Sequence, residues 1–433
     1  MRYTIVIIAL SISVFAANLA CAQHPVYFRH DNGLADDDAQ ALPDELDPAR
    51  AQWKQPLPPG ASTPTIVGER MYLTGNDGDQ LITLCLDRTS GKELWRHGIR
   101  VEKVEKVHTE GSPAAATVAC DGQRVFAFFG SLGLLCFDVD GKPLWTKKLG
   151  PFQDEFGASS SPILVDDKVI LSEDHDLNSF VIAIRRDDGE TLWQTPRDGF
   201  TRSYSTPVVW NGGGRKQLVV AGSLQLVGYD LAGGNQLWSL DGFARIVNTT
   251  PVAVDGTLFV ASWSPGGDTD ARIAMEPWET ALSLWDKNKD GILQSQELPA
   301  GEVQSRFFRI DLDGSQSLDE VEWNKYARVF ELAQNAMVAL KADPAGGPPQ
   351  IAWEYKRGIP YVASPLIYRD RVILVKDGGG LTALDATSGE VLYEERTERD
   401  RHRASPVWAN GNVYTTARNG TVTVTKAGRT FEM

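Results

Sequence analysis

The sequence has little of what marks several large classes of protein. It contains four cysteines in 433 residues. One of them, Cys21, belongs to the leader described below, which leaves the odd number Cys85, Cys120 and Cys136. A disulfide framework needs pairs, so we expect buried free thiols, with one bridge as the alternative. Acidic residues outnumber basic ones, 57 to 43, which gives a formal net charge of -14. A surface of this sign repels nucleic acid and anionic membranes, so neither is expected as a partner.

Familiar catalytic signatures are missing as well. The chain contains no G-x-S-x-G, no phosphate-binding P-loop and no H-E-x-x-H. Ordinary hydrolase and nucleotide-binding functions therefore have no support in the sequence. We identify no catalytic residue.

The long apolar run at the N-terminus indicates export. Arg2 precedes "TIVIIALSISVFAA" (residues 4–17), and Ala20–Ala22 has the A-x-A pattern of a cleavage site before Gln23. The run is too short for a transmembrane helix, and we expect no membrane span elsewhere. The rival to cleavage is lipid attachment at Cys21, because "NLAC" resembles a lipobox. In both cases the protein is exported, to the periplasm or the medium.

Repetition dominates the remaining sequence. A turn followed by an aromatic residue recurs: "SGKELW" ends at Trp95, "DGKPLW" at Trp145, "DGETLW" at Trp193, "GGNQLW" at Trp238 and the degenerate "SGEVLY" at Tyr393. Seven Ser-Pro or Thr-Pro starts lie upstream of such motifs, at Pro64, Pro113, Pro162, Pro207, Pro251, Pro365 and Pro406. Apart from one long interval, these starts are 41 to 49 residues apart. A fixed period of this length indicates a repeat architecture.

Each repeat has the pattern of a four-stranded antiparallel unit. Two stretches, such as "RVFAFFG" and "LGLLCFDVDG", are apolar enough for strands that are buried on both faces. An Asp-Gly or Ser-Gly pair then makes a hairpin turn into a fourth strand that carries the tryptophan. The sequence therefore predicts an all-β fold, a β-propeller of seven to eight four-stranded blades. We expect each tryptophan to pack between neighbouring blades, and the protein to be a monomer.

Two ways of closing the ring remain open. The segment Trp53–Pro58, "WKQPLP", precedes the first repeat. We expect it to form a lone fourth strand that completes the last blade, so that no sheet edge is left exposed. The ring either closes at seven blades or follows an eight-bladed plan that lacks most of its last blade.

These motifs resemble those of a known family. "ALDATSGEVL" (Ala383–Leu392), the repeated G-x-x-L-W and the Ser-Pro starts are similar to the pyrroloquinoline-quinone-type repeat propellers. That family includes quinoprotein alcohol dehydrogenases and lipoproteins of outer-membrane assembly. The likeness covers nearly all of residues 53–433 apart from one insertion. It is specific for the fold and says little about function, because the blade motif is structural.

The enzymes of this family have features that the chain lacks. They carry two adjacent cysteines beside the quinone, whereas the cysteines here are isolated. No stretch matches the Glu, Asn and Asp that hold the calcium ion of the quinone. The resemblance therefore favours a non-enzymatic propeller without quinone, and a dehydrogenase that depends on pyrroloquinoline quinone is the alternative.

An insertion interrupts the fifth repeat. Its Pro starts, Pro251 and Pro365, are roughly 65–70 residues further apart than the others. "TLFVASW" (Thr257–Trp263) is expected as the second strand of this blade, and "AMVALKA" (Ala336–Ala342) as the third. We therefore divide the chain into a signal peptide (1–22), an N-terminal extended segment (23–52), two propeller parts (53–263 and 336–433) and the insertion (264–335).

The insertion contains two segments with the ligand spacing of EF-hand calcium loops. "DKNKDGILQSQE" (Asp286–Glu297) has acidic or amide side chains at positions 1, 3, 5 and 12, and glycine at position 6. "DLDGSQSLDEVE" (Asp311–Glu322) has oxygen-bearing side chains at positions 1, 3, 5, 9 and 12. Its position 6, which needs φ > 0, is Gln316. The flanks have helical patterns, and Leu293 and Leu318 should pair the two loops.

Calcium is a hard cation that takes six to eight oxygen ligands, which such a loop supplies from carboxylates and one carbonyl. Magnesium is the weaker rival, because position 12 of each loop is a bidentate glutamate. The predicted ligands are Asp286, Asn288, Asp290, the Ile292 carbonyl and Glu297 in the first loop, and Asp311, Asp313, Ser315, the Ser317 carbonyl, Asp319 and Glu322 in the second.

Two further sets of polar residues are candidates. "SEDHDLNS" (Ser172–Ser179) could bind a metal or act as acid and base, although such a cluster is more often a solvated turn. Loops that lead into the first strands collect at one mouth of a propeller channel, where arginines could hold an anionic ligand. These loops carry His108, Glu110, Arg202, Tyr204, Arg245, Asn248, Tyr361, His402 and Arg403.

The sequence thus favours an exported, calcium-binding propeller that binds a protein or small-molecule partner. We expect the insertion to stand over the mouth lined by Arg202, Arg245, Tyr361 and His402, because the loop between second and third strands lies at that end of a blade. Calcium would fix it there as a lid or docking surface.

Overall fold

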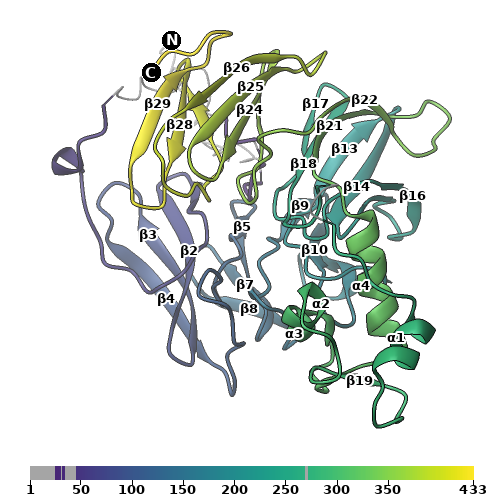
Figure 1. The fold of residues 1–433 in the computed structure, drawn as a ribbon. Helices are drawn as coiled ribbons and strands as arrows, with labels where there is room; N and C mark the ends of the chain where they lie inside the picture. Colours follow the sequence, from purple (N-terminus) through teal and green to yellow (C-terminus); the bar gives the residue numbers. More distant parts are fainter. Residues whose placement is uncertain (1–24, 31, 35–44, 269–271) are drawn as a thin grey trace, which may run out of the picture.

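The computed structural model describes residues 25–30, 32–34, 45–268 and 272–433. In these residues the strands form seven antiparallel sheets in chain order, six of four strands and the last of three (Figure 1). A separate two-stranded sheet lies within the insertion. The predicted all-β fold built from four-stranded repeats is confirmed.

Every strand of the seven sheets pairs with its neighbour in sequence, except where the insertion intervenes. The first sheet comprises β1 (Thr65–Val67), β2 (Arg70–Asp77), β3 (Gln80–Asp87) and β4 (Glu93–Arg100). The second comprises β5 (Ala119–Cys120), β6 (Arg124–Phe129), β7 (Gly133–Asp138) and β8 (Pro143–Lys148). The third comprises β9 (Ile163–Val165), β10 (Lys168–Glu173), β11 (Phe180–Arg185) and β12 (Thr191–Pro196). The fourth and fifth are β13 (Val208–Gly212), β14 (Arg215–Gly222), β15 (Gln225–Tyr229) and β16 (Gln236–Asp241); and β17 (Val252–Val254), β18 (Thr257–Ser262), β21 (Ala336–Lys341) and β22 (Gln350–Tyr355). The last two are β23 (Leu366–Tyr368), β24 (Arg371–Lys376), β25 (Gly380–Asp385) and β26 (Val391–Arg396); and β27 (Val407–Ala409), β28 (Asn412–Thr416) and β29 (Val422–Lys426). A short 3-10 helix, η1 (Pro48–Arg50), precedes them.

Apolar residues on both faces of the middle strands hold neighbouring sheets together. β6 and β7 are buried at nearly every position, while the outer strand β8 is half exposed. Phe126 and Phe128 of β6 share one core cluster with Val169 and Leu171 of β10 in the next sheet. Five further clusters join the other consecutive sheets in the same way. Since the second to sixth sheets each pack between two others, their middle strands need no polar face.

The prediction that tryptophans pack between repeats is confirmed, and the structure adds the surface that receives them. Four of these rings cover the hairpin glycine of the following sheet and donate from the indole nitrogen to a carbonyl of that turn, whereas Trp238 donates to Gln217 of its own sheet at 2.7 Å. For Trp145, an added Cβ on Gly189 would lie 2.8 Å from the ring, and the indole donates to Arg186 O at 3.0 Å. The same contact joins Trp95 to Gly141, Trp193 to Gly234 and Trp353 to Gly389.

The prediction that Trp53–Pro58 forms a strand is wrong. The segment is irregular, because its prolines cannot donate to a ladder. Trp53 nevertheless sits on Gly91 in the turn of the first sheet and donates to Arg88 O at 2.9 Å. It therefore occupies the place that the outer-strand tryptophan of a preceding blade would take, without the strand.

The insertion leaves the fifth sheet at β18 and returns at β21, as predicted. It comprises α1 (Trp278–Trp285), β19 (Leu293–Gln294), α2 (Glu302–Ser305), α3 (Phe307–Ile310), β20 (Ser317–Leu318) and α4 (Glu320–Leu332). These elements enclose a core of their own, with Trp278, Phe307, Trp323 and Phe330 buried in it. In Figure 1 the insertion lies beside β10 and β14, far from β28 and β29. None of the helices in the described residues is long and apolar enough to cross a membrane.

Candidate functional site

The two acidic loops of the insertion form one unit. Leu293 and Leu318, at position 8 of each loop, face each other across the antiparallel β19–β20 pair. Gly291 and Gln316, at position 6, have φ of 83° and 69°. The glutamine therefore adopts the left-handed conformation that the pattern requires, despite its side chain. Both loops thus have the same backbone course between the flanking helices.

In the first loop, carboxylates close the turn by accepting backbone hydrogen bonds. Asp286 accepts from the amides of Lys289 at 2.7 Å and Gly291 at 3.0 Å. Glu297 folds back from position 12 and accepts from the amides of Lys287 and Gln294, both at 3.0 Å. These contacts hold both ends of the loop around a common centre.

The other predicted ligands of the first loop lie on its exposed side. Asn288 donates from its amide to Asp290 at 2.8 Å, and Asp290 accepts the Ile292 amide at 3.1 Å. The positions predicted from spacing are thus brought together in one loop, with the Asn288 and Asp290 side chains already in contact.

The second loop gathers its acidic side chains more tightly. Oxygens of Asp311, Asp313 and Glu322 lie within 4.8 Å of one another. Ser315 donates to the carbonyl of Ser317 at 3.0 Å, so both predicted ligands point to the same region. Asp319 caps α4 by accepting from the Glu322 amide at 2.8 Å. Three carboxylates, a hydroxyl and a carbonyl form a donor set of hard oxygens, which fits calcium.

Burial sets the electrostatics of this cluster. Desolvation raises the pKa of Glu322, although backbone amides of Asp319, Asp313 and Leu312 oppose the shift. Hydrogen bonds from Ser315 lower the pKa of Asp313. The group of side chains within 4.8 Å consists of carboxylates only. A cation bound among them would relieve their repulsion.

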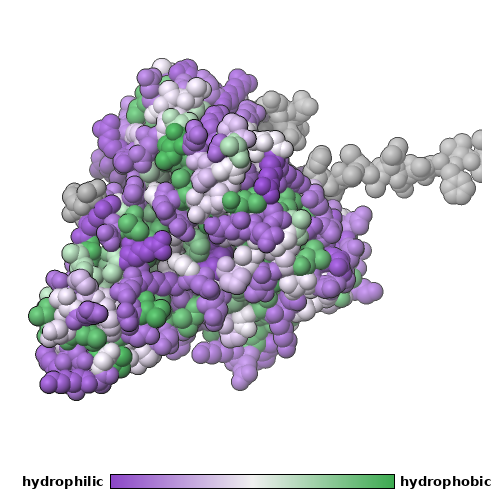
Figure 2. Space-filling view, turned by 90° about the vertical axis from the view of Figure 1, so that its right-hand side faces the viewer, coloured by the Kyte–Doolittle hydropathy of each residue, from purple (hydrophilic) through white to green (hydrophobic). Residues whose placement is uncertain are grey.

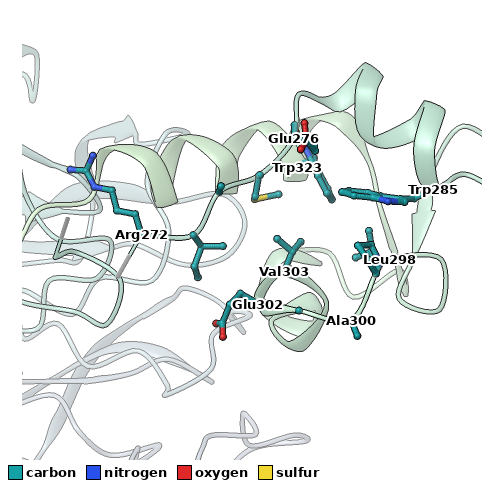
Figure 3. A pocket seen from close by; sticks show the side chains of 13 residues that line it. Arg272, Glu276, Trp285, Leu298, Ala300, Glu302, Val303 and Trp323 are labelled. Carbon is teal, nitrogen blue, oxygen red and sulfur yellow. The ribbon is translucent and has the colours of Figure 1, made fainter. Parts of the chain in front are cut away.

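Figure 3 shows a cavity beside the loops that was not predicted from the sequence. It has a volume of about 300 Å³ and lies between the segment 272–276 and the helices of the insertion. The rings of Trp285 and Trp323 and the side chains of Leu298 and Val303 form its apolar wall (Figure 3). Trp323 also donates to Glu276 O at 2.8 Å, which fixes the incoming chain over the helices.

A continuous polar chain joins the second loop to the propeller. Arg309, two residues before the loop, pairs with Glu155 at 3.2 Å. Glu155 also accepts from Arg202 at 2.9 Å, and Arg202 binds Asp176 in a bidentate pair. Nearby, Gln153 donates to the carbonyl of Leu312 inside the loop. The loop and the third sheet are thus mechanically connected.

The residues predicted to line one mouth fall into separate groups. The insertion reaches this face near Arg202, through Glu155 and Arg309, and at Arg245, which donates to Pro265 O, whereas the His402 ring contacts Asp400 O at 3.0 Å. Tyr361 forms a T-shaped contact with Trp263 and lies under Arg403 at 5.3 Å. Asn248 donates to Tyr361 O at 3.1 Å, Tyr204 donates to Asp154 at 2.8 Å, and His108 accepts from the Glu110 amide at 3.2 Å.

Two of the three predicted arginines already have carboxylate partners. Arg202 pairs with Asp176 and Glu155, and Arg403 pairs with Glu110 and Asp377. Arg245 is buried, donates to Pro265 O at 3.1 Å and has a pKa lowered by desolvation. The sequence missed Arg401 and Arg418, which join Arg403 on Glu110 at 2.7 Å each. The signal for Arg401 was the arginine-rich stretch around His402, whereas Arg418 lies outside that stretch.

The interpretation of "SEDHDLNS" as a solvated turn is wrong. It is the loop between β10 and β11, but Glu173, Asp174, His175 and Asp176 are all buried. His175 lies 3.3 Å from Glu173 and 3.9 Å from Asp154, and its ring stacks on Phe152. The neighbouring segment 152–156 packs over this loop and excludes water, which sequence periodicity did not reveal.

This buried group has shifted proton affinities. Burial raises the pKa of Glu173 to about 7, and that of Glu105 to about 7. Burial alone would lower the pKa of His175, but the adjacent carboxylates of Glu173 and Asp154 raise it to about 9. His175 is therefore held as an imidazolium between carboxylates. The two flanking carboxylates lie on opposite ring nitrogens, which suits an ion pair better than a shared metal.

Figure 2 shows one outer face of the molecule. Hydrophilic residues cover most of it, and hydrophobic residues appear in small separate groups. On the insertion, Phe308 and Val321 are 59% and 71% exposed. Single apolar side chains of this kind are ordinary on soluble surfaces.

These features define a repeat β-propeller with an inserted pair of helix–loop–helix units. A family model described as outer membrane protein assembly factor BamB matches residues 45–170, 83–316 and 328–430. The chain therefore belongs to that family, and the resemblance inferred from the repeats is confirmed. BamB from Moraxella catarrhalis has a TM-score of 0.52 and 14% identity, with 86% of this chain and 84% of that chain covered. At this identity the likeness concerns the fold alone.

Curated relatives include enzymes. Quinoprotein alcohol dehydrogenase PedH and quinohemoprotein alcohol dehydrogenase ADH IIB, both from Pseudomonas putida, are 28% identical over 153 residues and 27% identical over 115 residues. The matches cover 34% and 26% of this chain. The chain spans 23% and 17% of the length of these enzymes, so the matches concern shared repeats.

Proposed function

We propose that this protein is an exported, calcium-binding propeller that acts as a binding or scaffold protein. In this proposal the insertion is an EF-hand pair that calcium orders over part of one propeller face. The observation that carries it is the convergence of Asp311, Asp313 and Glu322 within 4.8 Å, in a loop paired with a second loop of the same spacing. Membership of a family described as an assembly factor supports the scaffold role.

The link between the loop and the propeller supports an ordering role for calcium. Carboxylates that face one another repel strongly unless a cation lies between them. The same loop holds Leu312, whose carbonyl binds Gln153, and follows Arg309, which binds Glu155. Calcium at the second loop would therefore fix the surface that the insertion presents, including the cavity in Figure 3.

Titration calorimetry with calcium chloride tests this proposal. We expect two sites, with affinities of about 10⁻⁵ to 10⁻³ M, as in extracellular modules. Glu297→Gln and Glu322→Gln should each abolish one site, because each removes a bidentate position-12 carboxylate. Glu320→Gln is the matched control: it makes the same change in the first turn of α4, on an exposed side chain outside the predicted ligands. Unchanged binding in both loop variants would refute the ligand assignment.

A quinoprotein-type oxidoreductase is the second candidate, because the curated relatives are alcohol dehydrogenases. The cysteines argue against it: Cys85, Cys120 and Cys136 are separate, free and buried. Incubation with pyrroloquinoline quinone and calcium, followed by gel filtration and an absorbance spectrum, distinguishes the two candidates. We expect no quinone to elute with the protein, and stoichiometric retention would favour the enzyme.

A further inference from the structure

The N-terminal segment lies inside the ring of sheets. Val26 and Cys120 exchange two main-chain hydrogen bonds, each of 2.8 Å, in an antiparallel bridge. Cys120 belongs to β5, the edge strand of the second sheet that lies against β1 and β9. Tyr27 packs against the cores between the second, third and fourth sheets. One end of the segment is therefore seated on the inner strands of these sheets.

The other end of the segment is bound to the opposite part of the chain. Gly33 O accepts from Trp408 N at 2.9 Å, and Leu34 forms a parallel bridge with Trp408 in β27. Asn32 donates to Ile367 O in β23 at 2.8 Å. The sixth and seventh sheets are thus tied to the same short segment as the second.

Arg29 lies between these anchors, and its described partners include main-chain carbonyls of both sheets. Its guanidinium donates to Pro365 O at 2.6 Å and to Pro406 O at 3.2 Å, which lead into the sixth and seventh sheets. Burial lowers the pKa of Arg29 to about 10. Arg29 is half-buried, and a charge partly removed from water is stabilised where its hydrogen-bond partners are held in place.

The junction between the seventh and first sheets lacks the packing seen elsewhere. Core clusters join all six pairs of sheets that are consecutive in the chain. The cluster on the remaining face of the first sheet, around Ile82, Leu84 and Leu86, is instead covered by Trp53. It includes no described residue of β27–β29. The seventh sheet also has only three strands in the described chain. The ion pairs of Glu110 with arginines of the last repeat span this junction, but such exposed pairs contribute little.

We propose that residues 25–30 and 32–34 form an internal clasp, a peptide bound in the propeller channel that ties the second sheet to the sixth and seventh and so closes the ring from inside. Single bridges at Val26 and Leu34 join its two ends to inner strands, the described residues between them form turns, and Arg29 and Asn32 supply side-chain recognition. This role is independent of calcium and goes beyond the function proposed above.

The native thiol of Cys120 provides a direct test of the placement. Hydrogen-bonded antiparallel pairs have Cα atoms about 5.5 Å apart, which a disulfide can span. In protein expressed from Gln23, oxidised Val26→Cys should lose two of its four thiols, as measured in denaturant, while Val26→Cys combined with Cys120→Ser should keep all three. Retention of all four thiols in the single variant would overturn the proposal.

The clasp function is tested on the full mature chain. Arg29→Ala with Asn32→Ala should lower the melting temperature by several degrees, and hydrogen exchange should quicken in β1–β4 and β27–β29 while β9–β16 stay protected. Arg50→Ala is the control, since Arg50 is an exposed arginine of the same N-terminal region. If the double variant melts and exchanges like the control, the clasp is rejected. Should the double variant fail to fold, oxidised Val26→Cys must melt above its reduced form, and equal melting would reject the clasp.

Discussion

At the scale of single residues, the repeats are held together by a contact between a tryptophan and a glycine, of which only the tryptophan was predicted from the sequence. The spacing of the tryptophans predicts their position in each outer strand, but their receptor is a glycine one repeat further along the chain. Gly189 has φ of 77° and no room for a side chain beneath Trp145. The glycine is thus required twice, by the turn and by the ring above it.

A comparison of Gly189→Ala with Gly78→Ala separates the cost of the left-handed backbone from the cost of displacing the Trp145 ring. Gly78 also has positive φ, 58°, in a hairpin turn, but nothing lies within 4 Å of an added Cβ. Alanine should cost about 1 kcal/mol at Gly78, from the left-handed backbone alone. At Gly189 the free energy of unfolding should fall by about 2 kcal/mol more, because Trp145 must shift. Denaturant melts measure both, and equal losses would contradict the packing role.

The buried loop of Glu173 and His175 makes stability depend on pH. The pKa of Glu173 is raised from 4.5 to about 7, so the folded protein holds a proton that the unfolded chain releases in this range. The free energy of unfolding should therefore fall as pH rises from about 4.5 to about 7. The pKa of His175 is raised from 6.5 to about 9, so the free energy of unfolding should continue to fall as pH rises through that range.

Glu173→Gln should flatten the lower part of this profile. Glutamine fills the same space but does not titrate, so its melts between pH 4.5 and 7 should vary less with pH than those of the unchanged protein. Glu190→Gln is the control, because Glu190 is exposed at the hairpin of the same sheet. If stability depends on pH equally in both variants and in the unchanged protein, the Glu173 carboxyl is ionised over the whole range from pH 4.5 to 7 and the prediction is wrong.

At the scale of elements, local patterns were predictable and contacts between distant segments were not. Alternating apolar runs and Asp-Gly turns predict the strands on both sides of the insertion, and loop spacing predicts the Leu293–Leu318 pairing. Burial of the β10–β11 loop depends on residues 152–156, which no periodicity connects to it. The prediction of a strand at Trp53–Pro58 was wrong because it relied on the need for a strand that closes the ring. It gave too little weight to the prolines, which cannot donate to a β-ladder.

Removal of calcium should loosen the insertion and leave the sheets intact. The insertion has its own apolar core around Trp323 and Phe330, whereas its second loop brings carboxylates together that would repel one another without a cation. With a chelator, limited proteolysis should cut first at Lys287, Lys289 and Arg309, with the sheets still resistant. The same digestion of Glu320→Gln serves as the control and should match the parent. Global digestion on chelation would show that calcium supports the whole fold, and no change would show that the loops are rigid without it.

At the scale of the whole molecule, the fold was predictable because the repeat is a property of sequence, while the closure of the ring is not. Every consecutive pair of sheets uses the same apolar faces, which the period reveals. The ends of the chain have no such period. Cys120 and Trp408 are joined through main-chain hydrogen bonds to one short N-terminal segment, and main-chain contacts leave little trace in side-chain patterns.

The place of Val26 also bears on processing of the N-terminus. The A-x-A motif predicts cleavage before Gln23, three residues before the bridge to Cys120. The intact mass of exported protein should correspond to a chain that begins at Gln23. Ala22→Leu, which spoils the cleavage motif, should retain the leader mass, and Gln23→Asn should be processed normally. A mass increased by a diacylglyceryl group on Cys21 would contradict cleavage and would instead place a lipid anchor a few residues from the propeller channel.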